Sequence, residues 1–419
     1  MQQIKRLSDR IGQFTEKNRD TIISVLFMLA ALIIGILLRI KLFPHHTADL
    51  DSYLAPWYNY LKEHGGFSAV GDEFGDYTPA YYYFMAALTY IKVDFALGIK
   101  LISTAFDIAL AFVVMRIIQL KLPKGSPVSL IAFAVTFCLP TVFLNSAAWG
   151  QCDSIYVLFI MLCLYKLMQG NERGAMIMLG AAFSFKLQIV FIMPLIGILL
   201  MRKKIRWRSL LWLPAVYTVS IIPAVIAGGK FTRLMTVYFR QSTEYKFLTM
   251  KVPNVYSVWG QKEVSVIGNS AVFFAGICVL MFMYFYITRK DLKLTKNTTV
   301  CLALLSAFLV PFVLPYMHER YTYLMEILYV IFSFWFAKRA WMIVTTQFVS
   351  VQCLSIYLFT QDMFDLRPLA FIMIFHAAVV VYTLQKEIEN PVDCDEIIMS
   401  FEQSGKAGKQ NPAKAAAEK

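Results

Sequence analysis

The sequence is poor in charged residues. Only 16% of its 419 residues are Asp, Glu, Lys or Arg, whereas 58% are hydrophobic. A soluble chain of this length would need several apolar cores separated by polar surface, and too few polar residues are present to build that surface. Apolar runs close to the length that crosses a bilayer recur along the chain. The composition therefore predicts an all-α polytopic membrane protein.

Cysteine is also scarce and unpatterned. The seven Cys fall mostly inside apolar segments, without the spacing of a disulfide framework or a metal site. We interpret them as packing residues, and the sequence predicts no metal or other cofactor from them.

Acidic residues are outnumbered by basic ones, which gives a net charge of +13. Such a surplus can indicate nucleic-acid binding, but here Lys and Arg gather in short clusters between the apolar runs, and no nucleic-acid partner is predicted. With the spans given below, every cluster falls on one side of the membrane, and the positive-inside rule makes that side cytoplasmic. Both termini are then cytoplasmic. The clusters lie at 5–19, 116–124, 202–208, 289–296 and 338–339.

The apolar runs predict about twelve transmembrane helices. The chain then divides into a cytoplasmic N-terminus (1–20), a membrane module (21–227) with a long first outer loop (44–96), a basic outer loop (228–265), a second membrane module (266–385) and a cytoplasmic polar tail (386–419). In the first outer loop, 51–63 and 79–92 are predicted to be interfacial helices, since both are rich in aromatic residues. The predicted spans are 21–43, 97–119, 127–143, 153–168, 174–187, 188–201, 209–227, 266–288, 298–315, 321–337, 340–359 and 367–385.

The first outer loop begins with two carboxylates, Asp49 and Asp51, close to the end of a span. A carboxylate near hydrocarbon is costly unless water, a partner or a function holds it there. One of the two can act as a general base toward a hydroxyl group. The simpler alternative is that Asp51 caps the following helix and Asp49 is merely solvated. A divalent cation shared by the pair is another alternative.

Four further segments place polar residues beside apolar runs. Asp76 and Tyr77 precede a Pro that starts a helix, so a structural turn is the alternative to a binding role. The segment 145–154 is polar for a hairpin tip, and can bind a sugar or simply turn the chain. Lys186 either extends to the interface or meets a phosphate. The triplet His318–Arg320 can grip a phosphate, with a local ion-pair cluster as the alternative.

The basic outer loop carries Lys230, Arg233, Arg240, Lys246, Lys251 and Lys262 against only Glu244 and Glu263. A basic surplus on the outer face opposes the positive-inside trend, which constrains longer loops less strongly. Such a surface suits an anionic lipid headgroup.

Six motifs occur in the order in which one enzyme superfamily carries them. They are TADLDSYLAPW, DYTPAYYY, NSAAWGQCDSIYVLF, FKLQIVFIMP, KVPNVYSVW and MHERYTYL, within residues 47–325. This set resembles the GT-C superfamily of polyprenyl-phosphate-sugar glycosyltransferases. The similarity is closest to the dolichyl-phosphate-glucose-dependent glucosyltransferases and to bacterial proteins related to GPI mannosyltransferases.

The resemblance implies a GT-C fold, with a conserved module over the first seven spans and a variable module after it. It implies that Asp49 is the catalytic base, with Asp51 in the place of a neighbouring acidic residue. It also implies that Lys186, His318, Glu319 and Arg320 hold the donor phosphate. Leu187 interrupts the Phe-Lys-Gln motif of the family before Gln188, and Thr78 replaces the first Pro of a Tyr-Pro-Pro motif. Residues predicted to bind sugar or acceptor are Trp57, Asp76, Tyr77, Trp149, Gln151, Asp153, Gln188, Asn254, Tyr256 and Tyr321.

The predicted activity is transfer of a hexose from a polyprenyl phosphate to a hydroxyl of a cell-envelope glycan or glycolipid, with inversion, at the extracytoplasmic face of a bacterial plasma membrane. A lipid-linked saccharide flippase and a polysaccharide polymerase or ligase are the alternatives. A transporter would place its charges along a path inside the spans, whereas here they collect at the outer ends.

Overall fold

The computed structural model describes residues 19–122, 126–241, 247–259, 267–360 and 364–391. The predicted N-terminus (1–20) and tail (386–419) fall almost entirely outside these residues, as do Lys246 and Lys262 of the basic loop. The described chain is helical except for two strands of two residues each, β1 (Thr249–Met250) and β2 (Met317–His318).

Thirteen of the described helices form the bundle, and shorter elements connect them. The bundle helices are α2 (Arg19–Leu42), α5 (Phe95–Ile118), α6 (Val128–Phe137), α7 (Pro140–Phe143), α8 (Asp153–Met168), α9 (Glu172–Phe185), α10 (Met193–Met201), α11 (Trp212–Ile226), α14 (Gly268–Thr288), α15 (Lys296–Val313), α16 (Tyr323–Trp335), α17 (Trp341–Leu358) and α18 (Leu366–Glu389). The shorter elements are η1 (Leu50–Leu54), α3 (Ala55–Glu63), η2 (Gly66–Ala69), α4 (Pro79–Leu88), η3 (Leu144–Trp149), η4 (Leu187–Phe191), η5 (Trp207–Leu211), α12 (Phe231–Met235), α13 (Val237–Gln241), η6 (Val255–Trp259), η7 (Glu319–Thr322) and η8 (Ala337–Arg339).

Each of the twelve predicted spans coincides with one or two helices. Fewer than twelve of the described helices are long enough to cross a bilayer. Seven described helices pass that test by length and composition, and an eighth span is possible if α6 and the segment Pro140–Trp149, bent by 43°, are taken together. The remaining helices α8, α9, α10 and α16 have 16, 14, 9 and 13 residues. A straight span needs about 20. The structure thus supports an integral membrane protein with seven or eight candidate spans.

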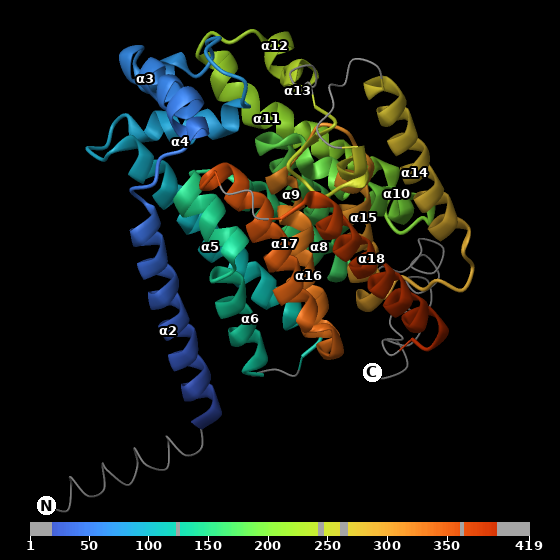
Figure 1. Ribbon diagram of the computed structural model, residues 1–419. Coiled ribbons are helices and arrows are strands. Elements are labelled where there is room, and N and C mark those ends of the chain that lie inside the picture. Colours follow the sequence, from blue (N-terminus) through green and yellow to red (C-terminus); the bar gives the residue numbers. More distant parts are fainter. Residues whose placement is uncertain (1–18, 123–125, 242–246, 260–266, 361–363, 392–419) are drawn as a thin grey trace, which may run out of the picture.

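The core lies among α5, α8, α9, α15, α16 and α18. Helix α8 packs on α9 and α5, and α15 packs on α16 and α18. In the apolar 18-residue stretch of α15, 78% of the sequence is buried inside the protein. In the corresponding stretches of α2 and α14, only 11% and 17% is buried. Helices α2 and α14 therefore lie at the edge of the bundle, as Figure 1 shows, with apolar side chains facing outward.

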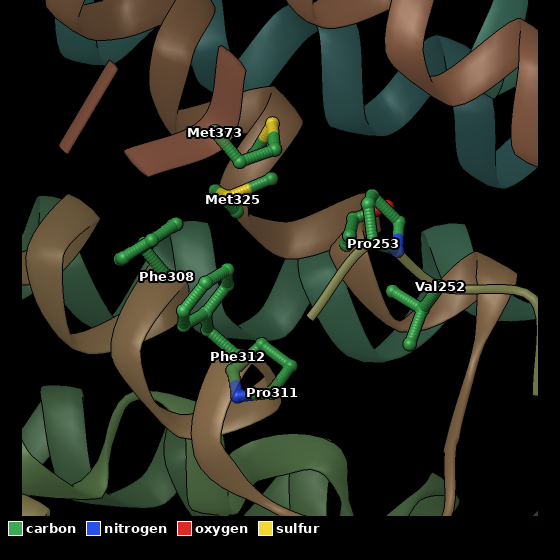
Figure 2. A pocket seen from close by; sticks show the side chains of 8 residues that line it. Val252, Pro253, Phe308, Pro311, Phe312, Met325 and Met373 are labelled. Carbon is green, nitrogen blue, oxygen red and sulfur yellow. The ribbon is translucent and has the colours of Figure 1, made fainter. Parts of the chain in front are cut away.

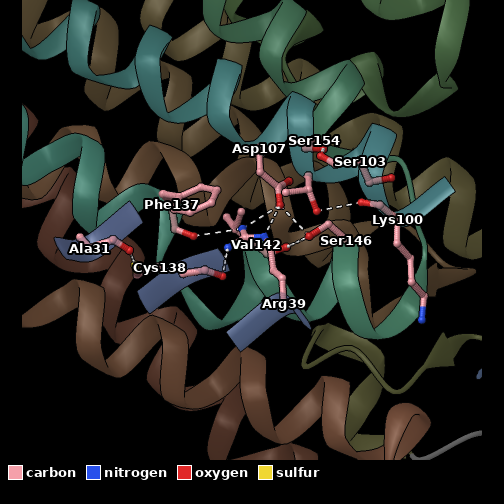
Figure 3. A network of polar contacts seen from close by, with 12 residues as sticks. Ala31, Arg39, Lys100, Ser103, Asp107, Phe137, Cys138, Val142, Ser146 and Ser154 are labelled. Atoms are coloured by element: carbon pink, nitrogen blue, oxygen red, sulfur yellow. Dashed lines mark hydrogen bonds and ion pairs between the residues drawn. The ribbon is translucent and has the colours of Figure 1, made fainter. Parts of the chain in front are cut away.

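A buried ion pair attaches α2 to the bundle (Figure 3). Arg39 donates to Asp107 of α5 at 2.8 Å, and neither side chain is exposed. Arg39 also donates to the carbonyl of Phe137 at 3.1 Å, and Ser146 donates to the same oxygen of Asp107 at 2.6 Å. Buried charges persist only when paired and hydrogen-bonded. This network fixes α2 against α5, α6 and η3.

The first outer loop is held to the bundle at several points. Helices α3 and α4 appear where the two helices of this loop were predicted, at the top of Figure 1 together with α12 and α13. Lys100 donates to the carbonyls of Phe43 and His45, at 2.9 and 2.5 Å, which fixes the chain where it leaves α2. Thr78 donates to the carbonyl of Ser184 at 2.6 Å. The loop is thereby tied to both α5 and the end of α9.

Candidate active site

Asp49 lies at the centre of a hydrogen-bonded group just beyond α2. Its Oδ2 atom accepts from Trp149 Nε1 at 3.0 Å and from Gln151 Nε2 at 2.9 Å. Its Oδ1 atom accepts from the hydroxyl of Tyr357 at 2.7 Å. The side chain is half-buried and caps no helix. Three donors from η3, the following loop and α17 therefore hold this carboxylate in place, so Asp49 is not merely solvated.

Asp51 has different surroundings. Its side chain is 57% exposed and bonds to His46 at 2.9 Å. Within the described residues, the two carboxylates share no hydrogen-bond partner, and no group of three or more side chains suited to a metal ion occurs. Of the two sequence candidates, Asp49 is therefore the one that lies within the cluster of polar residues.

An aromatic stack joins Asp49 to Arg320. The rings of Trp149 and Tyr357 are stacked at 4.3 Å between centroids, and the guanidinium carbon of Arg320 lies 5.5 Å from the centroid of Trp149. The Nε and Nη1 atoms of Arg320 are buried and have no hydrogen-bond partner among the described residues. Buried donors are normally satisfied. Two such donors on a cation suit an anionic ligand with paired oxygens.

A second ion pair lies beside this group. Lys186, directly after α9, donates to Asp153 at 2.6 Å, and Asn145 donates to the other oxygen of Asp153 at 2.7 Å. The ammonium of Lys186 lies 5.9 Å from the ring centroid of Tyr77, whose hydroxyl donates to Gln151 at 3.4 Å. Since Gln151 also donates to Asp49, a chain of contacts runs from Asp49 through Gln151 and Tyr77 to Lys186.

The triplet His318–Arg320 begins at the end of β2; Glu319 is buried, and His318 and Arg320 are half-buried. All three residues interact electrostatically with Asp49 and Asp153. Burial, with the charge of Arg320, lowers the pKa of His318 to about 3, so its imidazole is neutral at neutral pH. Burial raises the pKa of Glu319 to about 7. Burial alone would lower the pKa of Arg320, but the carboxylates of Asp153 and Asp49 outweigh it and keep the pKa well above its usual value. Arg320 is therefore a permanent cation in this group.

The basic outer loop reaches this triplet through a short ladder. Strand β1 pairs in parallel with β2, and Lys251 forms an antiparallel bridge with His318. Lys251 and Tyr316 both have positive φ, 64° and 66°, a strained conformation for residues other than Gly. The ladder places the backbone of the loop directly against His318.

The other predicted residues fall into three groups. Trp57 packs against the Tyr77 ring at 5.2 Å, and Tyr321 lies 5.2 Å from His318, so both border the site. Asp76 is exposed in the turn before α4. Gln188 lies in η4, and its side chain makes no hydrogen bond within the described part of the chain. Asn254 and Tyr256 organise the basic loop: Asn254 accepts from the backbone of residue 256 at 3.0 Å, and the hydroxyl of Tyr256 donates to Val313 at 2.7 Å.

Sequence reasoning missed three contributors. Tyr357 stands in an apolar helix among 22 tyrosines and carries no local signal. Lys100 and Glu326 are ionisable residues inside apolar segments, a signal that could have been used. Glu326 accepts from Thr322 of η7 at 2.6 Å and from Gln347 of α17 at 3.1 Å, and it also bonds Thr141 of α7. These contacts link η7, which carries Arg320, to α17, which carries Tyr357, and to α7, which directly precedes η3.

A small apolar pocket lies next to the triplet (Figure 2). Thr322, two residues after Arg320, is part of its wall, and the remaining lining is apolar. Side chains of α15, α16, α18 and the basic loop contribute to it: Phe308, Pro311, Phe312, Met325, Met373, Val252 and Pro253.

The family model of Glycosyltransferase family 87 matches residues 76–311, more than half of the chain. The chain belongs to glycosyltransferase family 87 (GT87). This is a GT-C family of membrane glycosyltransferases that depend on polyprenyl-phosphate sugars. No match was found among curated proteins.

The GT87 match confirms the resemblance inferred from the motifs and makes the chain an enzyme that transfers a sugar. Within 76–311 lie Tyr77, Trp149, Gln151, Asp153 and Lys186. Asp49, His318–Arg320 and Tyr357 lie outside it. The GT87 region therefore supplies Trp149 and Gln151, which contact Asp49, while Asp49, Arg320 and Tyr357 come from segments before and after it.

Proposed function

We propose that this GT87 chain transfers a hexose from a polyprenyl phosphate to a hydroxyl of a cell-envelope glycan or glycolipid, with Asp49 as the general base. The observation that carries the proposal is the arrangement around Trp149. Its indole N–H donates to Asp49, and its ring lies 5.5 Å from the Arg320 guanidinium carbon. A proton acceptor and a fixed cation thus flank one small region, as sugar transfer from a phosphate requires.

In this mechanism the acceptor hydroxyl attacks the anomeric carbon of the donor and gives its proton to Asp49. The bond between the anomeric carbon and the phosphate oxygen breaks, and its electron pair leaves with the polyprenyl phosphate. Attack from the face opposite the phosphate inverts the configuration. Negative charge accumulates on the leaving phosphate and is stabilised by Arg320, Lys186 and neutral His318. Glu319 orients its two neighbours, His318 and Arg320.

Basic side chains of the outer loop support an anionic lipid-linked donor. Lys230, Arg233, Arg240 and Lys251 attract a negatively charged headgroup.

We further propose that the site faces the outside of a bacterial plasma membrane, with both termini in the cytoplasm. The five basic clusters support this topology by the positive-inside rule. We also propose that 21–227 is the conserved GT-C module and 266–385 the variable one. Undecaprenyl phosphate is then the expected carrier.

The test uses the full chain in proteoliposomes with labelled undecaprenyl-phosphate glucose, mannose and galactose, each offered with a cell-envelope extract as acceptor. Release of undecaprenyl phosphate together with transfer of label to the extract is the expected result with at least one donor. Movement of the intact lipid-linked sugar across the bilayer without release would instead indicate a flippase and would refute the proposal.

Variants then identify the base. We expect Asp49→Asn to abolish transfer while the protein stays folded, because an amide cannot accept the proton. Asp72→Asn, in the same outer loop but bonded to Tyr60, is the matched control and should retain activity. Asp51→Asn separates the two neighbouring carboxylates: loss of transfer in this variant alone would reassign the base to Asp51.

A further inference from the structure

Tyr357 contacts Asp49 in two ways at once. Its hydroxyl donates to Asp49 Oδ1 at 2.7 Å and accepts from the backbone N–H of Asp49 at 3.1 Å. The N–H belongs to the first helical turn after α2, where backbone donors lack partners within the helix. One hydroxyl thus fixes both the side chain and the backbone of Asp49.

The remaining contacts of Asp49 divide its two oxygens unequally. Oδ2 accepts from both Trp149 and Gln151, at 3.0 and 2.9 Å. A carboxylate oxygen offers two lone-pair sites, so both sites of Oδ2 are filled. Oδ1 accepts one side-chain hydrogen bond from the described residues, that of Tyr357. An incoming hydroxyl can therefore bond Oδ1 without displacing any of these donors.

We infer that Tyr357 is a positioning residue for the transfer reaction, and that Oδ1 of Asp49 is the atom that receives the proton of the acceptor. This inference rests on the proposed function, in which Asp49 is the base. Tyr357 fills one lone-pair site of Oδ1 and leaves the other directed at the acceptor. Its own hydroxyl then lies beside the incoming hydroxyl and restricts the directions from which that group can approach.

The surroundings keep Tyr357 in this position. Its ring stacks on Trp149 with an interplanar angle of 14°, and Trp149 is almost fully buried, at 1% exposure. The carbonyl of Trp149 accepts from Thr47 at 3.2 Å, two residues before Asp49. Trp149 therefore restrains both Tyr357 and the chain that carries the base. Such rigid support is what a proton transfer needs, since small displacements of the base reduce its rate steeply.

The test is Tyr357→Phe in the proteoliposome assay, with the donor that the parent enzyme uses. The substitution keeps the ring and removes only the hydroxyl. We expect kcat to fall about 10- to 100-fold, the usual effect of losing a hydrogen bond to a charged group. The KM for the donor should stay unchanged, because the phosphate contacts are intact. Tyr329→Phe is the matched control, since the Tyr329 hydroxyl is buried in α16 without a hydrogen-bond partner in the described chain.

Single-turnover release of the carrier separates positioning from a general loss of structure. A smaller folded fraction lowers the amplitude of release but not its rate constant, whereas a misplaced base lowers the rate constant. We expect the rate constant of Tyr357→Phe to fall while its amplitude matches that of the parent. A lower amplitude at the parental rate constant would overturn the inference.

Two further outcomes distinguish the inference from the proposed function. A parental single-turnover rate constant in Tyr357→Phe, with Asp49→Asn inactive, would overturn the role of Tyr357 and leave Asp49 as the base. Transfer by Asp49→Asn would overturn the base itself, and with it the role of Tyr357.

Discussion

Replacing Arg320 tests the side of the site opposite the base. The Nε and Nη1 atoms of Arg320 are buried without hydrogen-bond partners in the described residues, and the guanidinium carbon is 5.5 Å from the Trp149 centroid and 6.0 Å from that of Tyr321. Two free donors at a fixed position stabilise a phosphate most when its charge is largest, as the glycosidic bond breaks. Arg320→Ala removes both donors and the charge together.

Loss of one preorganised donor costs about 2.7–4 kcal/mol of transition-state stabilisation, or about 10²–10³-fold in kcat. We therefore expect at least that loss in Arg320→Ala. Arg320→Lys keeps the charge but not the two parallel bonds, and should be intermediate. The exposed Arg367 at the start of α18 provides the control: Arg367→Ala removes an Arg whose partner is Asp365 and should leave kcat unchanged.

The assay is single-turnover release of undecaprenyl phosphate in proteoliposomes, with thermal unfolding measured on the same preparations. Single-turnover rates separate the chemical step from binding and product release. An Arg320→Ala enzyme that is folded and releases the carrier at the parental rate would refute the assignment of Arg320 to the leaving phosphate.

Two further predictions concern stability. Asp107→Ala leaves Arg39 buried without its carboxylate, and should lower the free energy of unfolding by about 3–5 kcal/mol. Asp291→Ala, which removes an exposed carboxylate from its pair with Arg289, should have a much smaller effect. A small effect of Asp107→Ala in denaturant titrations would contradict the role of the buried pair. Burial raises the pKa of Glu319 from its usual 4.5 to about 7, so the folded state holds this proton more tightly than the unfolded state. Relative to Glu319→Gln, the parent should lose stability as pH rises from about 4.5 to about 7 and not change further above it; parallel stability curves for the two proteins would contradict this.

The sequence was sufficient for the elements of the fold and for part of the site. Periodic apolar runs located a helix at each predicted span, because helix formation follows local pattern. The number of membrane crossings could not be predicted as well, because several helices are too short to cross a bilayer alone. Helix α9 ends where Lys186 adopts an extended conformation, and α10 is only nine residues long. Asp49, Lys186 and Arg320 stood out as ionisable groups beside apolar runs.

The residues that sequence reasoning missed act through long-range contacts. Tyr357 is 308 positions from the carboxylate that it bonds, and nothing in its own helix distinguishes it. Arg39 and Asp107 were detectable as charges inside predicted spans, but their pairing depends on how α2 packs on α5. Asn254 and Tyr256, predicted to bind sugar or acceptor, make hydrogen bonds that shape the outer loop.

The distance in sequence between Asp49 and Tyr357 has a consequence for biogenesis. The carboxylate of Asp49 comes soon after α2, but Tyr357, which we propose positions it, is synthesised some 308 residues later. A nascent chain that ends before α17 therefore lacks this contact, and we expect it to react no faster than Tyr357→Phe. The group around Asp49 is complete only after α17 has been inserted.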